Sequence, residues 1–146
     1  MKIKPLVNDF LKPEYKTDSS AGMDIYLQSK VVLKPEQDNI INLGFSAEVP
    51  EGYVALLVPR SSTGIKGINL RNTIGVIDSD YRGEWIAHII LDNISTQEGY
   101  IKSKFTFERG ERLIQCLIVP IYKANIEITD TLSDTARGTG GFGSTN

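Results

Sequence analysis

The stretch "GYVALLVPRSSTG", residues 52–64, decides the fold class because a run of β-prone residues ends abruptly in a polar turn. Runs of the same kind recur between turn signals: "MDIYL" (23–27), "KVVL" (30–33), "NIINLGFSAEV" (39–49), "NTIGVI" (72–77), "WIAHIIL" (85–91), "KFTF" (104–107), "RLIQCLIVPIY" (112–122) and "NIEIT" (125–129). Many short strands at this spacing are typical of an all-β sandwich or barrel. No window of a dozen residues combines helical periodicity with caps, so helix is expected to be minor, at most one turn around residues 61–67.

The length of 146 residues fits a single domain, because a chain of this size buries about 70% of the surface that its unfolded form exposes. From "DTLSDTARG" (130–138) onward the apolar content falls. Such a segment lacks the side chains that would offset the entropy of ordering it. We therefore expect a β domain over residues 1–131 and a tail over residues 132–146.

Composition narrows the class of function. Hydrophobic residues make up 40% and charged residues 23%, as in ordinary globular proteins, and the net charge of −2 argues against broad nucleic-acid binding. No apolar run is long enough to span a bilayer, and "MKIKPLVNDF" (1–10) lacks the apolar stretch and cleavage site of a secretion signal. A cytoplasmic setting is expected, in the host cytoplasm if the protein is viral.

The chain has one cysteine and one histidine. Cys116 lies in an apolar run and is predicted to be a buried, inert thiol. His88 lies in a strand-like run and is interpreted as a satisfied strand histidine, with a catalytic role as the minority interpretation. A His/Cys metal cage is excluded, and so are Ser-His-Asp and Cys-His triads unless His88 serves. An enzyme would have to use carboxylates, hydroxyls, arginines, backbone amides or a metal held mostly by its substrate.

Three segments that are far apart in the sequence favour phosphate or base recognition. In "VPRSSTG" (58–64), an arginine, serine hydroxyls and turn amides suit a polyphosphate, although a plain polar loop fits equally well. The stretch "GVIDSDYRGEW" (75–85) indicates a hairpin with carboxylates and a ring at its mouth, or ordinary turn formers. The end, "RGTGGFGSTN" (137–146), offers glycine amides, a forked cation, hydroxyls and a flat ring, or is a disordered terminus.

Taken together and in order, these segments resemble the five motifs of the trimeric dUTP diphosphatase (dUTPase) family. The motifs are "AGMDIYL" (21–27), "PRSSTG" (59–64), "GVIDSDYRG" (75–83), "GERLIQCLI" (110–118) and "RGTGGFGST" (137–145), which together span nearly the whole chain. The resemblance implies a jelly-roll-like all-β subunit and a homotrimer with three active sites shared between subunits. It also implies that residues 132–146 form a mobile arm that closes over the substrate.

The resemblance further implies hydrolysis of dUTP to dUMP and pyrophosphate, with Asp78 orienting the water that attacks the α-phosphorus. The substrate-binding residues would be Arg60, Ser61, Ser62 and Gln115 at the phosphates, Asn72, Gly75, Val76, Ile77 and Ile86 at the base, Tyr81 under the sugar, and Arg137, Phe142, Gly143, Ser144 and Thr145 in the arm. Asp24 and Arg112 would brace the site. Mg²⁺ would be held by substrate phosphates and water near Gln115 and Asp24, with no direct protein ligand.

Two departures from the family pattern and two alternative functions stay open. Ser62 stands where the family often has glycine, which bears on the path of the phosphate loop. The stretch "ISTQEGYIKSK" (94–104) is longer than the common family form and predicts a surface excursion where a protein partner could bind. A dCTP deaminase shares the architecture, and a regulatory protein could use dUTP as a switch for partner binding. Neither nucleic acid nor a membrane is expected as a partner.

Overall fold

The computed structural model describes residues 1–35, 37–91, 95–96, 99–100 and 104–141. The strands are β1 (Lys2–Pro5), β2 (Met23–Tyr26), β3 (Val31–Leu33), β4 (Asn39–Asn42), β5 (Phe45–Glu48), β6 (Tyr53–Pro59), β7 (Ile68–Leu70), β8 (Gly75–Ile77), β9 (Ile86–Leu91), β10 (Ser95–Thr96), β11 (Gly99–Tyr100), β12 (Phe105–Phe107) and β13 (Arg112–Pro120). Within these ranges the helix is a single turn, α1 (Ser61–Gly64). The predicted all-β class is confirmed, and so is the helical turn after residue 60.

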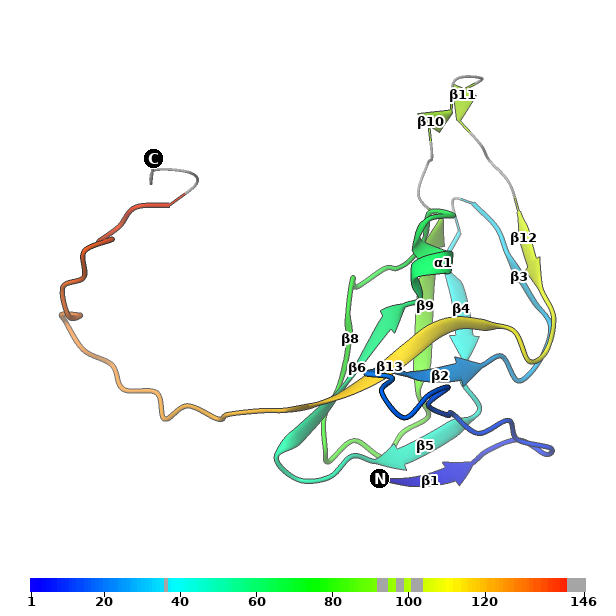
Figure 1. Cartoon of the computed structure of the whole chain (residues 1–146), viewed down its shortest axis with the longest axis horizontal. Helices are drawn as coiled ribbons and strands as arrows, with labels where there is room; N and C mark the ends of the chain where they lie inside the picture. The colour runs from blue at the N-terminus through cyan, green and yellow to red at the C-terminus, as the bar shows by residue number, and fades with distance from the viewer. Residues whose placement is uncertain (36, 92–94, 97–98, 101–103, 142–146) are drawn as a thin grey trace.

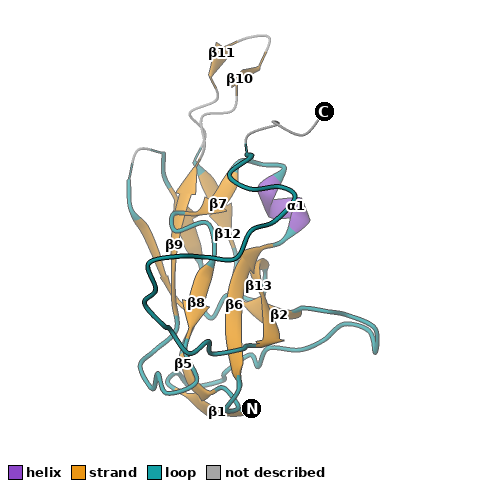
Figure 2. Cartoon of the chain, turned by 90° about the vertical axis from the view of Figure 1, so that its left-hand side faces the viewer, coloured by secondary structure: helices purple, strands orange, loops and turns teal. Residues whose placement is uncertain are grey.

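Two antiparallel sheets contain most of the longer strands (Figures 1 and 2). One has the order β2-β13-β6-β8 and the other the order β4-β9-β7, while β1-β5, β12-β3 and β10-β11 form separate pairs. In β4 the side chains alternate with the two-residue period of a strand, so that Ile41 is buried while Ile40 is exposed. The buried residues of both larger sheets belong to one hydrophobic core.

Aromatic rings fill the core where the chain enters β9. Trp85 is fully buried, and its ring centroid lies 5.0 Å from that of Phe45, which in turn lies 5.6 Å from Phe10. The backbone is bonded at the same place, because Trp85 N donates to Phe45 O at 2.9 Å and Leu43 N donates to Trp85 O at 2.9 Å. The entry to β9 is therefore fixed to the core beside β5.

Strand β6 places two parts of the molecule at opposite ends. Its partner β8 pairs Ile77 with Ala55, near the start of β6, whereas β13 pairs Ile114 with Pro59 at the end of β6. The seven residues of β6 rise about 3.3 Å each, so the two ends lie roughly 20 Å apart. The turn that follows β8 therefore lies far from α1, which follows β6.

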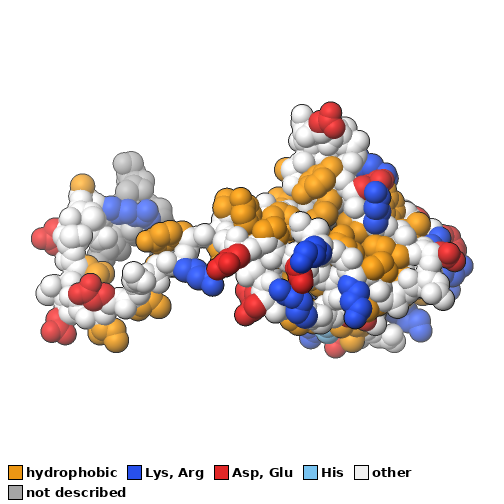
Figure 3. All heavy atoms as spheres, turned by 90° about the horizontal axis from the view of Figure 1, so that it is seen from below, with side chains coloured by type: hydrophobic (Ala, Val, Ile, Leu, Met, Phe, Trp, Pro, Cys, Tyr) orange, Lys and Arg blue, Asp and Glu red, His pale blue; other side chains and the backbone are white. Residues whose placement is uncertain are grey.

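Every predicted run contains a strand except "NIEIT" (125–129), where the prediction was wrong. This run belongs to a segment that leaves the sheets after β13 (Figure 1), and none of the described strands pairs with it. Figure 3 shows hydrophobic side chains along the segment, away from the body of the molecule. Ile126 and Ile128 are 93% and 96% exposed. A strand pattern without a neighbouring strand in the same chain forms no ladder, which explains the difference.

The structure also contains strands that the sequence did not reveal. β1 is rich in lysine and ends in proline, and β7 has only three residues, so neither gives a clear alternating pattern. The predicted excursion at residues 94–104 contains the β10-β11 hairpin, which projects beyond the ends of the sheets (Figures 1 and 2). Residues 94, 97–98 and 101–103 of this stretch lie outside the described residues. No helix in the described part of the chain has the length and apolar character needed to cross a membrane.

Candidate active site

Asp24 on β2 pairs with two arginines, Arg112 on the adjacent strand β13 and Arg60 between β6 and α1. Its Oδ1 forms an ion pair with Arg60 Nε at 2.7 Å, and its Oδ2 accepts a hydrogen bond from Arg112 Nη1 at 2.8 Å. The Asp24 side chain is 8% exposed, while those of Arg60 and Arg112 are 28% and 32% exposed. A nearly buried carboxylate with two ion pairs, one of them also a charge-assisted hydrogen bond, fixes both guanidiniums at the surface. We call these three residues the Asp24 cluster.

Gln115 lies beside the Asp24 cluster. The strand register places it opposite Asp24 on β2 and Val58 on β6. Its Nε2 donates to the Pro59 carbonyl at 3.4 Å. Gly22 provides the space for this side chain, because a Cβ at that position would lie 2.7 Å from Gln115 Oε1. The amide is therefore held across the end of β6, next to the arginines.

Ser61 and Ser62 begin α1 and are exposed. Ser62 lines a hollow of about 260 Å³ together with Arg60 and Arg112. Its backbone is helical and has no positive φ, so the position does not need the conformational freedom of glycine. The serine at this position is therefore compatible with the helical backbone of α1.

A second hollow of about 260 Å³ brings together three residues predicted for the base. It is lined by Asn72, Gly75 and Ile86, with Leu57, Leu70, Arg71 and His88. Gly75 lets β8 lie close to β6, because a Cβ there would lie 3.0 Å from Leu57 Cβ. Of the remaining predicted base contacts, Val76 is exposed and Ile77 is half-buried on the same strand.

The rim of this pocket contains an unusual backbone conformation. Thr73 has φ +64°, which a β-branched residue rarely adopts. Two hydrogen bonds hold the turn: Thr73 N donates to Leu70 O at 2.9 Å and Ile74 N donates to Asn72 O at 2.6 Å. The conformation fixes Asn72 at the mouth of the pocket, and such constrained positions are common at functional sites.

His88 is a lining residue that the sequence interpretation missed. It was assigned as a satisfied strand histidine, yet it is exposed on β9 and lines the pocket with Ile86. The signal was present in the spacing, because residues two apart on a strand face the same side. His88 therefore lies on the same face of β9 as Ile86.

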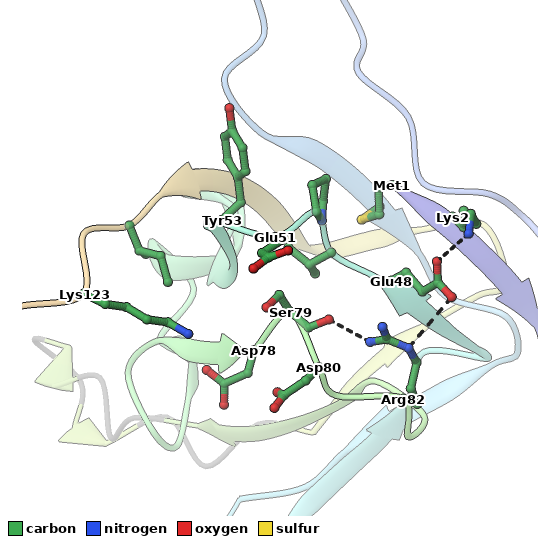
Figure 4. A pocket seen from close by; sticks show the side chains of 13 residues that line it. Met1, Lys2, Glu48, Glu51, Tyr53, Asp78, Ser79, Asp80, Arg82 and Lys123 are labelled. Atoms are coloured by element: carbon green, nitrogen blue, oxygen red, sulfur yellow. Dashed lines mark hydrogen bonds and ion pairs between the residues drawn. The ribbon is translucent and has the colours of Figure 1, made fainter.

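Asp78 follows β8 directly and is exposed in a turn that continues to Glu84, which we call the 78–84 turn. Asp78 and Asp80 line a hollow of about 730 Å³ beside β5 and the start of β6. Figure 4 shows the two carboxylates on the same side of the turn, while the Arg82 guanidinium points toward Glu48. Tyr81 N donates to Asp78 O at 3.2 Å, and Tyr81 Oη donates to Glu84 O at 3.1 Å.

The predicted site residues thus fall into separate groups on one chain. The Asp24 cluster, Gln115 and the two serines lie at the end of β6, whereas Asp78 lies beside the start of that strand. Their separation of roughly 20 Å far exceeds the reach of a hydrogen bond, about 3 Å. One chain alone does not bring Asp78 and Arg60 to the same phosphate.

The C-terminal part of the predicted site is described only in part. Arg137 is exposed, and its Nε donates to Gly140 O at 2.8 Å. Phe142, Gly143, Ser144 and Thr145 lie outside the described residues.

Cys116 on β13 is fully buried, which confirms the predicted buried thiol. Burial raises the pKa of this thiol to about 12.

Comparisons with known proteins agree on one family. The family model for dUTPase matches residues 8–146. The deoxyuridine 5'-triphosphate nucleotidohydrolase of Nautilia profundicola is 40% identical over 146 residues, which cover 99% of this chain and 97% of that protein. The enzyme of the same name from Clostridium tetani is also 40% identical, over 99% of this chain and 95% of its own.

A solved structure matches over almost the same length. The dUTPase of Staphylococcus bacteriophage 80alpha, solved with dUPNHPP, superposes with a TM-score of 0.84 at 29% identity, covering 99% of this chain and 97% of that one. That structure is reported with the statement that phage dUTPases control transfer of virulence genes by a proto-oncogenic G protein-like mechanism.

Proposed function

The chain belongs to the dUTPase family, and we propose that it hydrolyses dUTP to dUMP and pyrophosphate. The observation that carries the proposal is the exposed Asp78 carboxylate, which follows the strand whose Gly75 lines a pocket with Asn72. A base held in that pocket would present its sugar and α-phosphate toward the 78–84 turn. We place the reaction in the cytoplasm, or in the host cytoplasm if the protein is viral.

The phosphates would lie at the end of β6. Arg60, Ser61 and Ser62 would donate to phosphate oxygens, with Gln115 beside them. Asp24 pairs with Arg60 at 2.7 Å and so holds its guanidinium in place before the substrate arrives. Preorganised donors of this kind stabilise the charge of a phosphoryl transition state without reorganisation during the reaction.

The base and sugar would be selected by the pocket and the turn. Asn72 and the backbone of Gly75, Val76 and Ile77 would pair with the uracil edge, and Ile86 would line the pocket. Cytosine would present a donor where uracil presents an acceptor, and the unpaired buried group would cost about 1–3 kcal/mol. Tyr81 would pack under the deoxyribose and leave no room for a 2′-hydroxyl.

Asp78 would act on the water. Its carboxylate would accept a hydrogen bond from a water molecule and orient it for in-line attack on the α-phosphorus, with pyrophosphate leaving on the opposite side. Such a reaction depends chiefly on positioning and charge stabilisation, so a chain without a catalytic histidine or cysteine can perform it.

The polar groups near the phosphates fit a Mg²⁺ ion that the substrate brings. No group of three or more His, Cys, Asp or Glu side chains in the described part of the chain is arranged to hold a metal ion, and Asp24 is already paired with two arginines. Gln115 would contact water of the ion's hydration shell near Asp24. Bound to the triphosphate, Mg²⁺ would neutralise charge that develops on the phosphate oxygens.

We propose a homotrimer with shared active sites, and the separation along β6 supports the sharing of sites between subunits. If Asp78 of one copy meets Arg60 of another, the roughly 20 Å between them within one chain is no obstacle. The segment after β13 supports this arrangement, because Ile126 and Ile128 are almost fully exposed in the isolated chain. Residues 132–146 would form an arm that brings Arg137, Phe142, Gly143, Ser144 and Thr145 to a neighbouring site. Fully extended, the last ten of these residues, 137–146, alone reach at most about 33–36 Å.

The decisive experiment measures pyrophosphate release with each of dUTP, dCTP, dTTP, dATP and dGTP. We expect selective turnover of dUTP, lost in Asp78→Asn. Ammonia release from dCTP would instead identify a deaminase, and full activity of Asp78→Asn would refute the role of that residue.

Subunit complementation tests the shared site. Asp78→Asn and Arg60→Ala should each be nearly inactive alone. Co-expressed, they should recover about a quarter of the wild-type rate, because each site then draws its two halves at random. If both residues served one phosphate within one subunit, the mixed preparation would stay inactive.

A regulatory role is the second candidate, and the projecting β10-β11 hairpin favours it (Figure 1). The segment 94–104 would contact a protein partner whose binding depends on dUTP. Deleting residues 95–100 should abolish binding of such a partner while leaving dUTP turnover intact, which separates this role from catalysis.

A further inference from the structure

The 78–84 turn contains Asp78 and Tyr81 but belongs to no strand. It is largely exposed, and within it the backbone bond from Tyr81 N to Asp78 O spans 3.2 Å. A turn with so little backbone bonding needs side chains to fix its shape. Two charged residues of the turn, Arg82 and Glu84, make hydrogen bonds suited to this purpose.

Arg82 bonds to the turn itself. Its Nη1 donates to the carbonyl of Ser79 at 2.7 Å and to the carbonyl of Tyr81 at 3.0 Å. Its Nε lies 3.9 Å from Glu48 Oε1, so the guanidinium lies between β5 and the turn, as Figure 4 shows. The Ser79 carbonyl follows Asp78 by one residue. Arg82 therefore fixes the backbone that sets the direction of the Asp78 carboxylate.

Glu84 bonds outward to the body of the protein. Its Oε1 accepts from Gly44 N and its Oε2 accepts from Asn42 Nδ2, each at 3.1 Å. The Glu84 carbonyl accepts the Tyr81 hydroxyl at 3.1 Å. Trp85, the next residue, is fully buried. Through Glu84, the Tyr81 ring is thus tied to the same core that fixes the entry to β9.

We infer that Arg82 and Glu84 are positioning residues with different effects: Arg82 orients Asp78 toward the attacking water, and Glu84 holds the Tyr81 ring against the sugar. The inference rests on the proposed function for the roles of Asp78 and Tyr81. Removing Arg82 should reduce the rate of the chemical step. Removing Glu84 should reduce discrimination between deoxyribose and ribose.

The kinetic test separates the two residues. For Arg82→Ala we expect kcat to fall about tenfold with KM for dUTP changed less than about twofold, because misplacement of a reacting group affects the chemical step. For Glu84→Ala we expect the ratio of kcat/KM for dUTP over UTP to fall by roughly tenfold. Glu84→Gln should restore the ratio, since its amide oxygen still accepts from Gly44 N.

Two further variants guard against trivial explanations. Lys30→Ala removes an exposed cation that also pairs with a glutamate, Glu108, at 2.6 Å, but makes no bond to the 78–84 turn. It should keep wild-type kinetics. Arg82→Lys retains the charge near Glu48 but not the planar fork of donors, so we expect a kcat between those of wild type and Arg82→Ala. If Arg82→Ala does not fold, Arg82→Lys carries the test.

Amide hydrogen exchange without nucleotide gives a readout that is independent of turnover. Arg82→Ala should speed exchange in residues 78–84 while leaving β6 and β13 unchanged. Unchanged exchange in the turn, or faster exchange without a fall in kcat, would overturn the inference for Arg82. An unaltered dUTP/UTP ratio in Glu84→Ala would overturn it for Glu84. If the wild-type protein fails to hydrolyse dUTP, the proposed function fails instead, while the exchange data still decide whether Arg82 holds the turn.

Discussion

The two ends of β6 present charged groups in contrasting ways. At the end of the strand, Asp24 is 8% exposed and pairs with two arginines, one on β13 and one directly after β6. Beside the start of the strand, Asp78 is exposed in a turn whose shape depends on bonds from Arg82 and Glu84. Asp24 lies on a strand of the sheet, whereas Asp78 lies in a turn outside the strands.

This contrast predicts that the two ends of β6 contribute differently to the stability of the fold and to catalytic activity. A nearly buried carboxylate that pairs with two arginines contributes to folding as well as to any site it supports, because leaving its partners without a counter-charge is costly. An exposed carboxylate in a turn contributes little to folding. Substitutions at the two ends of β6 should therefore differ in what they damage.

The largest expected effect is on activity, at Asp78. Asp78→Asn should lower kcat for dUTP by about 10²–10⁴-fold, the range for losing a general base. The free energy of unfolding should change by less than about 0.5 kcal/mol, because the side chain is exposed. Pyrophosphate release and urea unfolding measure the two quantities. A large loss of stability in this variant would erase the contrast between the ends of the strand.

Asp24 should show the opposite balance. Asp24→Ala should lower the free energy of unfolding by about 3 kcal/mol, near the low end for breaking a buried ion pair, since its arginines are partly solvated. Asp38→Ala is the matched control: Asp38 pairs with Arg71, and both side chains are well exposed. That variant should lose at most about 1 kcal/mol. If both variants lost the same free energy of unfolding, burial of Asp24 would not make its ion pairs more stabilising than an exposed one.

Gly83 tests how closely the turn is packed. A Cβ at this position would overlap Tyr81 Oη, so in Gly83→Ala the tyrosine side chain must move. We expect the ratio of kcat/KM for dUTP over UTP to fall by roughly tenfold, since one misfitted group is worth about 1–3 kcal/mol. Unfolding should be much less affected than in Asp24→Ala. A ratio that stays at the wild-type value would mean that the ring position does not select the sugar.

The buried thiol of Cys116, on β13 beside the Asp24 cluster, should make the free energy of unfolding depend on pH in the alkaline range. Burial raises the pKa of this thiol from 9.0 to about 12. The folded chain therefore keeps a proton that the unfolded chain loses above pH 9. The associated stability is fully present below pH 9 and is lost as pH rises toward 12, by up to about 1.4 kcal/mol per pH unit. Urea unfolding of wild type and Cys116→Ala should be compared from about pH 8 to about pH 10, on either side of the unfolded pKa. Above pH 9, the free energy of unfolding should fall with pH more steeply in the wild type than in Cys116→Ala.

Sequence patterns predicted the strands wherever a run of β-prone residues finds a partner within the chain. They failed at residues 125–129, because the pattern there has no partner strand among the described residues. β1 escaped detection because lysines and a proline obscure its alternation. What decides such cases is pairing with distant residues, which a local pattern does not contain.

The candidate site shows the same limit. Resemblance to a family singled out Arg60 as a phosphate contact and Asp24 and Arg112 as bracing residues, and the structure brings the three together. Arg82 and Glu84 were not identified, although Arg82 stands in the same motif as Asp78 and Glu84 directly follows that motif. Several of their partners are backbone groups, the carbonyls of Ser79 and Tyr81 and the amide of Gly44, which have no signature in a side-chain pattern. Such contacts emerge only from the folded backbone.

Trp85 gives this protein a built-in optical probe. It is the one tryptophan of the chain, it directly follows the turn that contains Tyr81, and its ring is sealed from solvent against Phe45. Within the described residues its indole Nε1 has no hydrogen-bond partner. Indole emission responds to water and to nearby polar groups. Any opening of this part of the molecule should therefore shift the emission toward the red, so stopped-flow fluorescence could follow the enzyme in real time without an attached dye.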